Sequence, residues 1–200
     1  MSTKTPILLV VDLQQLIVDR PPKTWGTRST PNLTTTVPKI LSAFRANNLP
    51  VIHVQHQSIN PSHPLHASQT ANVAPHPCAA PLEGEPVIVK LTGSAFVNTN
   101  LVEILENSGG KEKNRLVIIG VDGAECINST TRSAADLGWE VQVVPEACAS
   151  YEVGDRRGEG GEIIEAEVVH KVVMGILVGY AKLVGVEELL GELSGKTEKL

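Results

Sequence analysis

Short apolar segments alternate along the chain with longer segments of helical spacing. The apolar segments are rich in Val, Ile and Leu and occupy residues 7–12, 49–56, 86–90, 115–121 and 139–147. Their apolar residues are nearly continuous instead of alternating with polar ones, as expected of parallel strands that are covered on both faces. Residues 181–186 form a further, shorter candidate strand.

The segments between these strands carry apolar residues at the spacing of amphipathic helices. Helices are expected over residues 33–48, 98–110, 126–138 and about 161–182. Because strand and helix signals alternate, the sequence predicts one α/β domain over residues 1–200, with three α/β/α layers. Its sheet should be mainly parallel and Rossmann-like, with about six strands and right-handed crossovers.

Two segments lack any periodicity and are expected to be loops. Residues 57–85 are rich in proline, and residues 151–162 are rich in glycine and charge. Structureless loops of such length in a compact domain are usually functional.

Composition and charge exclude several classes of protein. The 200 residues carry 17 Lys plus Arg against 22 Asp plus Glu, a net charge of -5, and neither sign gathers into a stripe. Nucleic acid is therefore not an expected partner. The apolar segment that ends at Asp12 is too short to span a membrane. Three cysteines without CxxC spacing suit a reducing compartment, so a cytoplasmic location is expected.

Candidate chemistry stands where three predicted strands end. Asp12 follows the first strand, Lys90 ends the segment 86–90, and a turn leads from the segment 115–121 to Cys126. The carboxyl ends of parallel strands meet at one edge of the sheet, which is where open α/β folds bind their ligands. We therefore expect these three side chains to converge.

The turn before Cys126 favours a reactive thiol. The segment GVDGAEC (120–126) places two glycines between a strand and a helix that we expect to begin at Cys126. The positive end of that helix and the nearby Lys90 should favour the thiolate. Asp12 could accept the thiol proton and return it to a leaving group, and backbone N–H groups of the turn could bind an oxyanion.

Three segments resemble the signature blocks of the isochorismatase-like cysteine hydrolases, in the same order. They are VVDLQ (10–14), PVIVKLTGSAF (86–96) and GVDGAECINSTTRSAADLGWEV (120–141). The resemblance implies the isochorismatase-like hydrolase fold and a catalytic triad of Asp12, Lys90 and Cys126 without a cofactor. It further implies a cis peptide bond between Val121 and Asp122, an oxyanion hole formed by the backbone N–H groups of Asp122 and Cys126, and a homo-oligomer, a dimer or tetramer.

Five of the six histidines lie between residues 53 and 76, which raises the question of a metal site. Nicotinamidases of this superfamily carry an Asp-x-His pair after the second strand, where this chain has His56, Gln57 and Ser58. No metal is therefore expected, and His56 is predicted to contact a small-molecule substrate. Ile17 and Trp25 are further candidates for the substrate pocket, although Trp25 could equally cover the core.

Three functions are compatible with these residues. The leading hypothesis is hydrolysis of a small amide or a related C–N bond through a covalent acyl-enzyme at Cys126. An alternative is cleavage of isochorismate or another vinyl ether, with Asp12 as general acid and no covalent step. The third is a non-catalytic binding module on the same scaffold, for which a broken triad would be expected.

Overall fold

The computed structural model describes residues 4–19, 26–109, 115–154 and 162–195. Its main sheet contains six strands, all paired in parallel, in the order β3-β2-β1-β4-β5-β8. They are β1 (Pro6–Val11), β2 (Val51–His56), β3 (Val87–Lys90), β4 (Arg115–Gly120), β5 (Glu140–Cys148) and β8 (Lys182–Leu183). The predicted mainly parallel sheet, including its short sixth strand, is confirmed.

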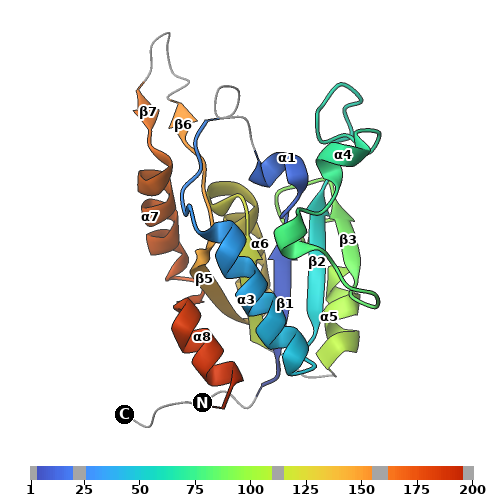
Figure 1. The fold of residues 1–200 in the computed structure, drawn as a ribbon, viewed down its shortest axis with the longest axis vertical. Helices are drawn as coiled ribbons and strands as arrows, with labels where there is room; N and C mark the ends of the chain where they lie inside the picture. The colour runs from blue at the N-terminus through green and yellow to red at the C-terminus, as the bar shows by residue number, and fades with distance from the viewer. Residues whose placement is uncertain (1–3, 20–25, 110–114, 155–161, 196–200) are drawn as a thin grey trace.

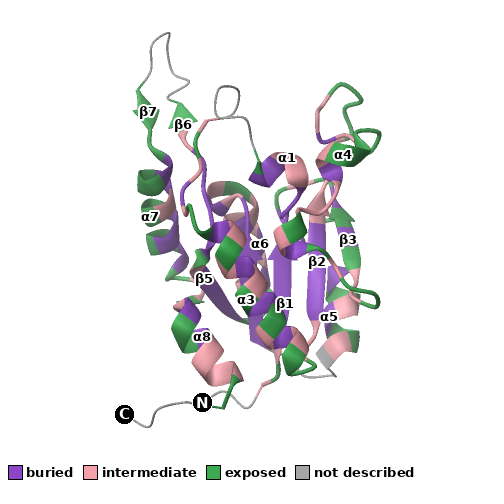
Figure 2. Ribbon diagram, viewed as in Figure 1, coloured by how far each residue is buried: buried purple, intermediate pink, exposed green. Residues whose placement is uncertain are grey.

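Helices cover both faces of this sheet and complete the three predicted layers (Figure 1). The helices α3 (Leu33–Ala46) and α8 (Val186–Leu193) pack on one face. The other face carries α5 (Leu101–Gly109), α6 (Asn128–Asp136) and α7 (Ala166–Leu177). Figure 2 shows β1, β2 and β5 largely buried between the two helical layers, as their continuous apolar sequences predict. The edge strand β3 differs, because Val87 and Val89 on one of its faces are exposed.

Several short elements were not predicted. Three lie in segments expected to be loops or linkers: α1 (Gln15–Val18), α4 (Thr70–Val73) and the 3₁₀ turn η1 (Pro77–Ala79). A two-stranded hairpin pairs β6 (Val153–Gly154) with β7 (Ile163–Ile164), and α8 follows β8. The single turns and two-residue strands contain too few residues for a periodicity to be recognised, whereas α8 was missed although its eight residues carry apolar side chains at helical spacing.

The strand order reverses between β1 and β4. From β1 the chain runs outward through β2 to β3, whereas β4, β5 and β8 extend the sheet in the opposite direction. At this switch point a Cβ on Gly120 would stand 2.0 Å from the Val11 carbonyl oxygen, so only glycine fits there. Open α/β sheets bind their ligands outside the carboxyl ends of the strands at such a point.

No helix within the four described ranges is long and apolar enough to cross a membrane.

Candidate active site

Asp12 and Lys90 meet at the carboxyl edge of the sheet. Asp12 directly follows β1 in a left-handed conformation with φ of 54°, which is uncommon outside glycine but tolerated by aspartate. Lys90 is the last residue of β3, on the far side of β2. Its Nζ lies 2.7 Å from Asp12 Oδ2, and the two side chains are 0% and 1% exposed. They form a fully buried ion pair.

The Lys90 ammonium also reaches the third predicted residue. Its Nζ donates hydrogen bonds to Cys126 Sγ at 3.1 Å and to the Thr92 carbonyl at 3.0 Å. Cys126 itself is half-buried, whereas Asp12 and Lys90 are fully buried, so the cysteine is the most exposed residue of this group. The three residues expected to converge from the strand order are therefore brought together around one ammonium group.

Cys126 lies in a wide helical turn. The turn spans Gly123–Ile127 with π-helical geometry and continues into α6, so the helix begins three residues before the predicted start. Asp122 caps it, because its carboxylate accepts the Ala124 N–H at 2.9 Å. The Asp122 carbonyl accepts the N–H groups of Glu125 and Ile127, the residues on either side of Cys126. The peptide bond between Val121 and Asp122 is cis.

Burial of Cys126 opposes the thiolate that its sequence context favours. Burial raises the pKa of Cys126 to about 12, and the negative charge of Asp12 raises it further, while Lys90 acts in the opposite direction. Desolvation of a thiolate outweighs the attraction of one ammonium that is already paired with a carboxylate. A lone strand-turn-helix motif does not reveal how deeply the sulfur is buried.

The charges of Asp12 and Lys90 support one another. Burial raises the pKa of Asp12, against the opposing effect of Lys90. Burial also lowers the pKa of Lys90, but the negative charges of Asp12 and Cys126 outweigh it and the pKa is raised overall. The site therefore contains one positive charge, on Lys90, and one negative charge. Transfer of a proton from the thiol to the carboxylate would move the negative charge from Asp12 to Cys126.

His56 lies beside this group. It ends β2 and is paired in register with Lys90. Burial, followed by the charges of Lys90 and His63, lowers the pKa of His56 to about 4, so its imidazole is neutral near pH 7. Its Nδ1 is buried and has no hydrogen-bond partner among the described residues. The imidazole also has a backbone hydrogen bond with Thr92, which acts on the pKa of His56 in the opposite direction.

The residue that holds His56 in place is not among the residues predicted for the site. Gln14 is 0% exposed, and its side-chain oxygen accepts the His56 N–H at 2.7 Å. Its side-chain nitrogen donates to the carbonyls of His56 and Val73, both at 3.0 Å. Gln14 thereby ties the loop after β2 to the end of β1. The only signal for it was its place in the VVDLQ block.

Ile17, another predicted pocket residue, has its contacts in the apolar core. Ile17 is 5% exposed and packs in the apolar cluster on the α3 side of the sheet. Its carbonyl accepts a hydrogen bond from the Tyr151 hydroxyl. Trp25 lies outside the described residues.

The histidines of the loop region have separate partners. His53 bonds Glu85 at 2.9 Å, His66 bonds Ser68 at 2.8 Å, and His76 lies 3.4 Å from Asp19. In the part of the chain that the structure describes, no three His, Cys, Asp or Glu side chains are grouped so that they could hold a metal ion.

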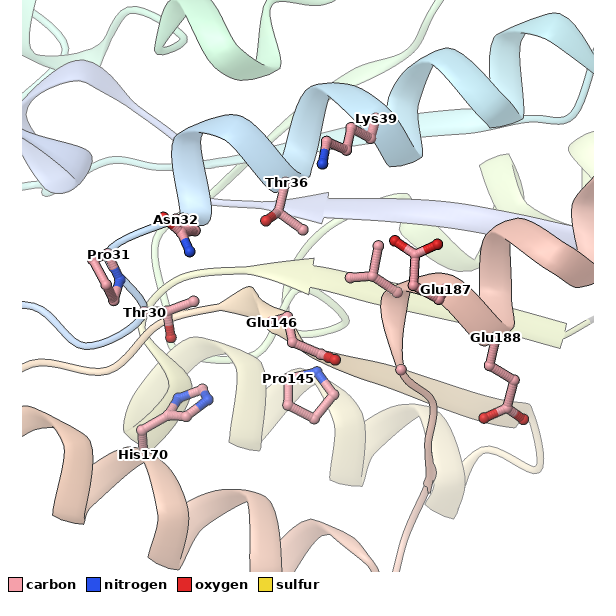
Figure 3. A pocket seen from close by; sticks show the side chains of 12 residues that line it. Thr30, Pro31, Asn32, Thr36, Lys39, Pro145, Glu146, His170, Glu187 and Glu188 are labelled. Atoms are coloured by element: carbon pink, nitrogen blue, oxygen red, sulfur yellow. The ribbon is translucent and has the colours of Figure 1, made fainter.

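A cavity of about 560 Å³ lies elsewhere on the molecule (Figure 3). It is lined by the start of α3, the middle of β5, His170 of α7 and the start of α8. Asp12, Lys90 and Cys126 are not among its lining residues.

Comparison with known proteins agrees with this architecture. The Isochorismatase domain family model matches residues 6–163. The isochorismatase family protein YddQ of Bacillus subtilis is 40% identical over 156 residues, which cover 76% of this chain and 81% of that protein. A solved isochorismatase family protein from Chromobacterium violaceum superposes with a TM-score of 0.87 at 33% identity, covering 98% of this chain and 96% of that one.

The chain therefore belongs to the isochorismatase family and is an isochorismatase-like hydrolase. A cysteine hydrolase from Pseudomonas syringae pv. phaseolicola shares the fold, with a TM-score of 0.80 at 18% identity and coverage of 98% of this chain and 96% of that one.

Proposed function

We propose that this hydrolase cleaves a small amide or a related C–N bond through a covalent acyl-enzyme on Cys126. The observation that carries the proposal is the arrangement of a carboxylate and a thiol around the ammonium of Lys90. Lys90 Nζ lies 2.7 Å from Asp12 Oδ2 and 3.1 Å from Cys126 Sγ. A nucleophile whose proton can pass to a neighbouring base is the requirement of covalent hydrolysis.

The first step transfers a proton as the sulfur attacks. The thiol of Cys126 gives its proton to Asp12 while the sulfur forms a bond with the substrate carbonyl carbon. The raised pKa of Asp12, which burial causes, makes this carboxylate a stronger base than an exposed one. Lys90 remains an ammonium throughout and balances the negative charge as it moves from the carboxylate to the substrate oxygen.

The developing oxyanion would be bound by the backbone N–H groups of Asp122 and Cys126. The hydrogen bonding of the turn supports this role for Cys126, because Glu125 and Ile127 donate to the Asp122 carbonyl at 3.2 and 2.9 Å. A regular α-helix would use the Cys126 N–H for that carbonyl. Preorganised backbone donors of this kind stabilise tetrahedral intermediates.

The remaining steps return the proton and release the acyl group. Asp12 protonates the leaving nitrogen as the C–N bond breaks, which leaves an acyl group on Cys126. Water then attacks the thioester and gives a proton to Asp12. Asp12 passes this proton to the departing sulfur, so the thiol is restored and the carboxylic acid is released. His56 would orient the substrate, because its neutral imidazole offers a buried Nδ1 as acceptor for an N–H or O–H group.

The test is ammonia release from a panel of small primary amides, namely acetamide, benzamide and nicotinamide, together with p-nitrophenyl acetate as a chromogenic acyl donor. The wild type should turn over at least one member of the panel, and Cys126→Ala should abolish that turnover while its circular dichroism is unchanged. Cys78→Ala is the matched control, because Cys78 is a half-buried thiol outside the group. A fully active Cys126→Ala protein would refute the proposal.

A second function is favoured by the raised pKa of Asp12, because a buried carboxyl can also act as an acid. Asp12 could protonate a vinyl ether such as isochorismate without any covalent step. In that case isochorismate would be converted, no ammonia would form, and Cys126→Ala would remain active. If none of these substrates is converted and iodoacetamide does not label Cys126, the non-catalytic binding module is the correct hypothesis.

A further inference from the structure

Beyond Gly120, the catalytic turn rests on the end of β5. The pairing of β4 with β5 is regular up to Ile118 and Val143 and then shifts, so that Gly120 pairs with Cys148. The extra residues form a bulge that carries the chain after Cys148 toward the turn. There Ala149 donates its N–H to the Gly120 carbonyl at 3.1 Å, and its carbonyl accepts the Gly123 N–H at 2.7 Å.

The next residue, Ser150, fills the space beside Gly123. Ser150 is 0% exposed, and its Oγ would lie only 2.3 Å from a Cβ built on Gly123. The next nearest atoms to that Cβ are the Ala149 carbonyl oxygen at 3.4 Å and Ser150 Cβ at 3.5 Å, which are ordinary contacts. The hydroxyl of Ser150 is therefore the one close obstacle to a side chain at position 123.

His170 is the hydrogen-bond partner of this hydroxyl. Its Nδ1 lies 3.4 Å from Ser150 Oγ, at the long end of the range for a hydrogen bond. Figure 3 shows His170 projecting from α7 beside Pro145. The contact joins α7 to the segment after β5.

The backbone of Ser150 is held as firmly. Its N–H donates to Ser29 Oγ at 2.9 Å, and its carbonyl accepts the Ser29 N–H at 2.9 Å. Rotation of the hydroxyl away from Gly123 would break the contact with His170, and the backbone cannot retreat without breaking both bonds to Ser29. The contact between Ser150 and Gly123 is therefore stiff.

We infer that Ser150 and His170 are positioning residues of the hydrolytic reaction. Ser150, with His170 bonded to its hydroxyl, fills the space beside Gly123. This packing holds the turn from Asp122 to Cys126 in the geometry that directs its N–H groups at the substrate oxygen. The inference rests on the proposed function, since it assigns these N–H groups to an oxyanion. Ser150 and His170 do not touch the reacting atoms in this scheme and act through the turn.

The test is a double-mutant cycle between Gly123→Ala and Ser150→Ala, assayed with p-nitrophenyl acetate. The added methyl group of Gly123→Ala displaces the hydroxyl, and we expect kcat to fall roughly 10- to 100-fold with little change in KM. This decrease is smaller than the one caused by complete removal of an oxyanion-hole donor, because the donor is displaced and not lost. Ser150→Ala should lower kcat by about tenfold. Because the obstacle is the hydroxyl alone, the double variant should be no slower than Ser150→Ala and faster than Gly123→Ala.

His170→Asn gives an independent measurement if Gly123→Ala does not fold. It should lower kcat by about as much as Ser150→Ala, and combining the two should add little, because both release the same hydroxyl. Ser108→Ala is the matched control. It removes a hydroxyl that bonds the Ile104 carbonyl within α5, and kcat should be unchanged.

Two results would overturn the inference: a double variant slower than Gly123→Ala, or wild-type kcat in both Ser150→Ala and His170→Asn. Iodoacetamide should label Cys126 at the wild-type rate in Ser150→Ala, because the nucleophile itself is untouched. Failure of the proposed function is recognised separately, by turnover of p-nitrophenyl acetate that persists in Cys126→Ala.

Discussion

Lys90 Nζ lies 2.7 Å from Asp12 Oδ2, and both side chains are closed off from solvent, whereas Cys126, which shares this ammonium, is half-buried. The carboxylate and the thiol therefore compete for one counter-charge in a buried site. Because the charges are coupled, replacing either member of the ion pair should change the reactivity of Cys126, and the two replacements should act in opposite directions.

Replacing Asp12 by Asn should separate nucleophilicity from catalysis. The carboxylate raises the pKa of Cys126, so its removal leaves the thiol facing Lys90 alone, and the pKa should fall below about 12. Iodoacetamide should label Cys126 at pH 8 at least about tenfold faster than in the wild type. Hydrolysis should nevertheless fall by roughly 100- to 10,000-fold, because the proton acceptor is lost.

The measurements for Asp12→Asn are peptide mass spectrometry of the alkylated protein and steady-state kinetics on the same preparation. Undiminished hydrolysis would remove Asp12 from the mechanism. Unchanged labelling would mean that its charge does not act on the thiol.

Replacing Lys90 by Met should slow the labelling of Cys126. Without the ammonium, the burial that already raises the pKa values of Asp12 and Cys126 is no longer opposed. Loss of one member of a buried ion pair should also lower the free energy of unfolding by about 3 kcal/mol. Urea denaturation and the alkylation rate, measured side by side, check both expectations, and labelling faster than in the wild type would contradict the first.

Replacing Gln14 by Leu should destabilise the loop after β2. The variant leaves the N–H and carbonyl of His56 and the carbonyl of Val73 without their partner. Buried groups left unpaired cost about 1 to 3 kcal/mol each, so the free energy of unfolding should fall by at least about 2 kcal/mol in urea. Gln15→Leu, at the neighbouring half-buried position, is the control and should cost less.

Acid should destabilise the protein through Glu85. Burial alone would raise the pKa of this carboxyl, but the hydrogen bonds from Arg45, Leu82 and His53 outweigh it and lower the pKa to about 2. In the unfolded chain the pKa of Glu85 is the ordinary 4.5, so between pH 4.5 and about 2 the unfolded chain binds more protons than the folded protein. The free energy of unfolding therefore falls as the pH drops from about 4.5 toward about 2.

The contact of Glu85 with His53 acts in the same direction. Burial lowers the pKa of His53, so at neutral pH the contact is a hydrogen bond that the neutral imidazole donates to the Glu85 carboxylate. Because the pKa of His53 is lower in the folded protein than in the unfolded chain, protonation of His53 below pH 6.5 lowers the stability. Glu85→Gln should flatten the dependence of the unfolding free energy on pH between about 4.5 and about 2. The exposed Glu83→Gln is the control. An equal slope in wild type and Glu85→Gln would show that this carboxyl does not carry the effect.

The local sequence determined the elements, and through them the convergence of the candidate triad. Continuous apolar runs predicted five buried strands and their parallel pairing, and the ends of parallel strands necessarily share an edge. Asp12, Lys90 and Cys126 could thus be brought together without coordinates. The family could also be recognised from short blocks, since these residues lie in contiguous motifs around each strand end.

Tertiary structure decided the properties that depend on neighbours far along the chain. The raised pKa of Cys126 follows from its burial, and the lowered pKa of His56 follows from burial and then from the charge of Lys90. Gln14 and Ser150 are ordinary polar residues in the sequence, and only the folded chain brings them against His56 and Gly123. Periodicity reports which face of an element is buried, whereas desolvation and close contact depend on which atoms fill the space against it.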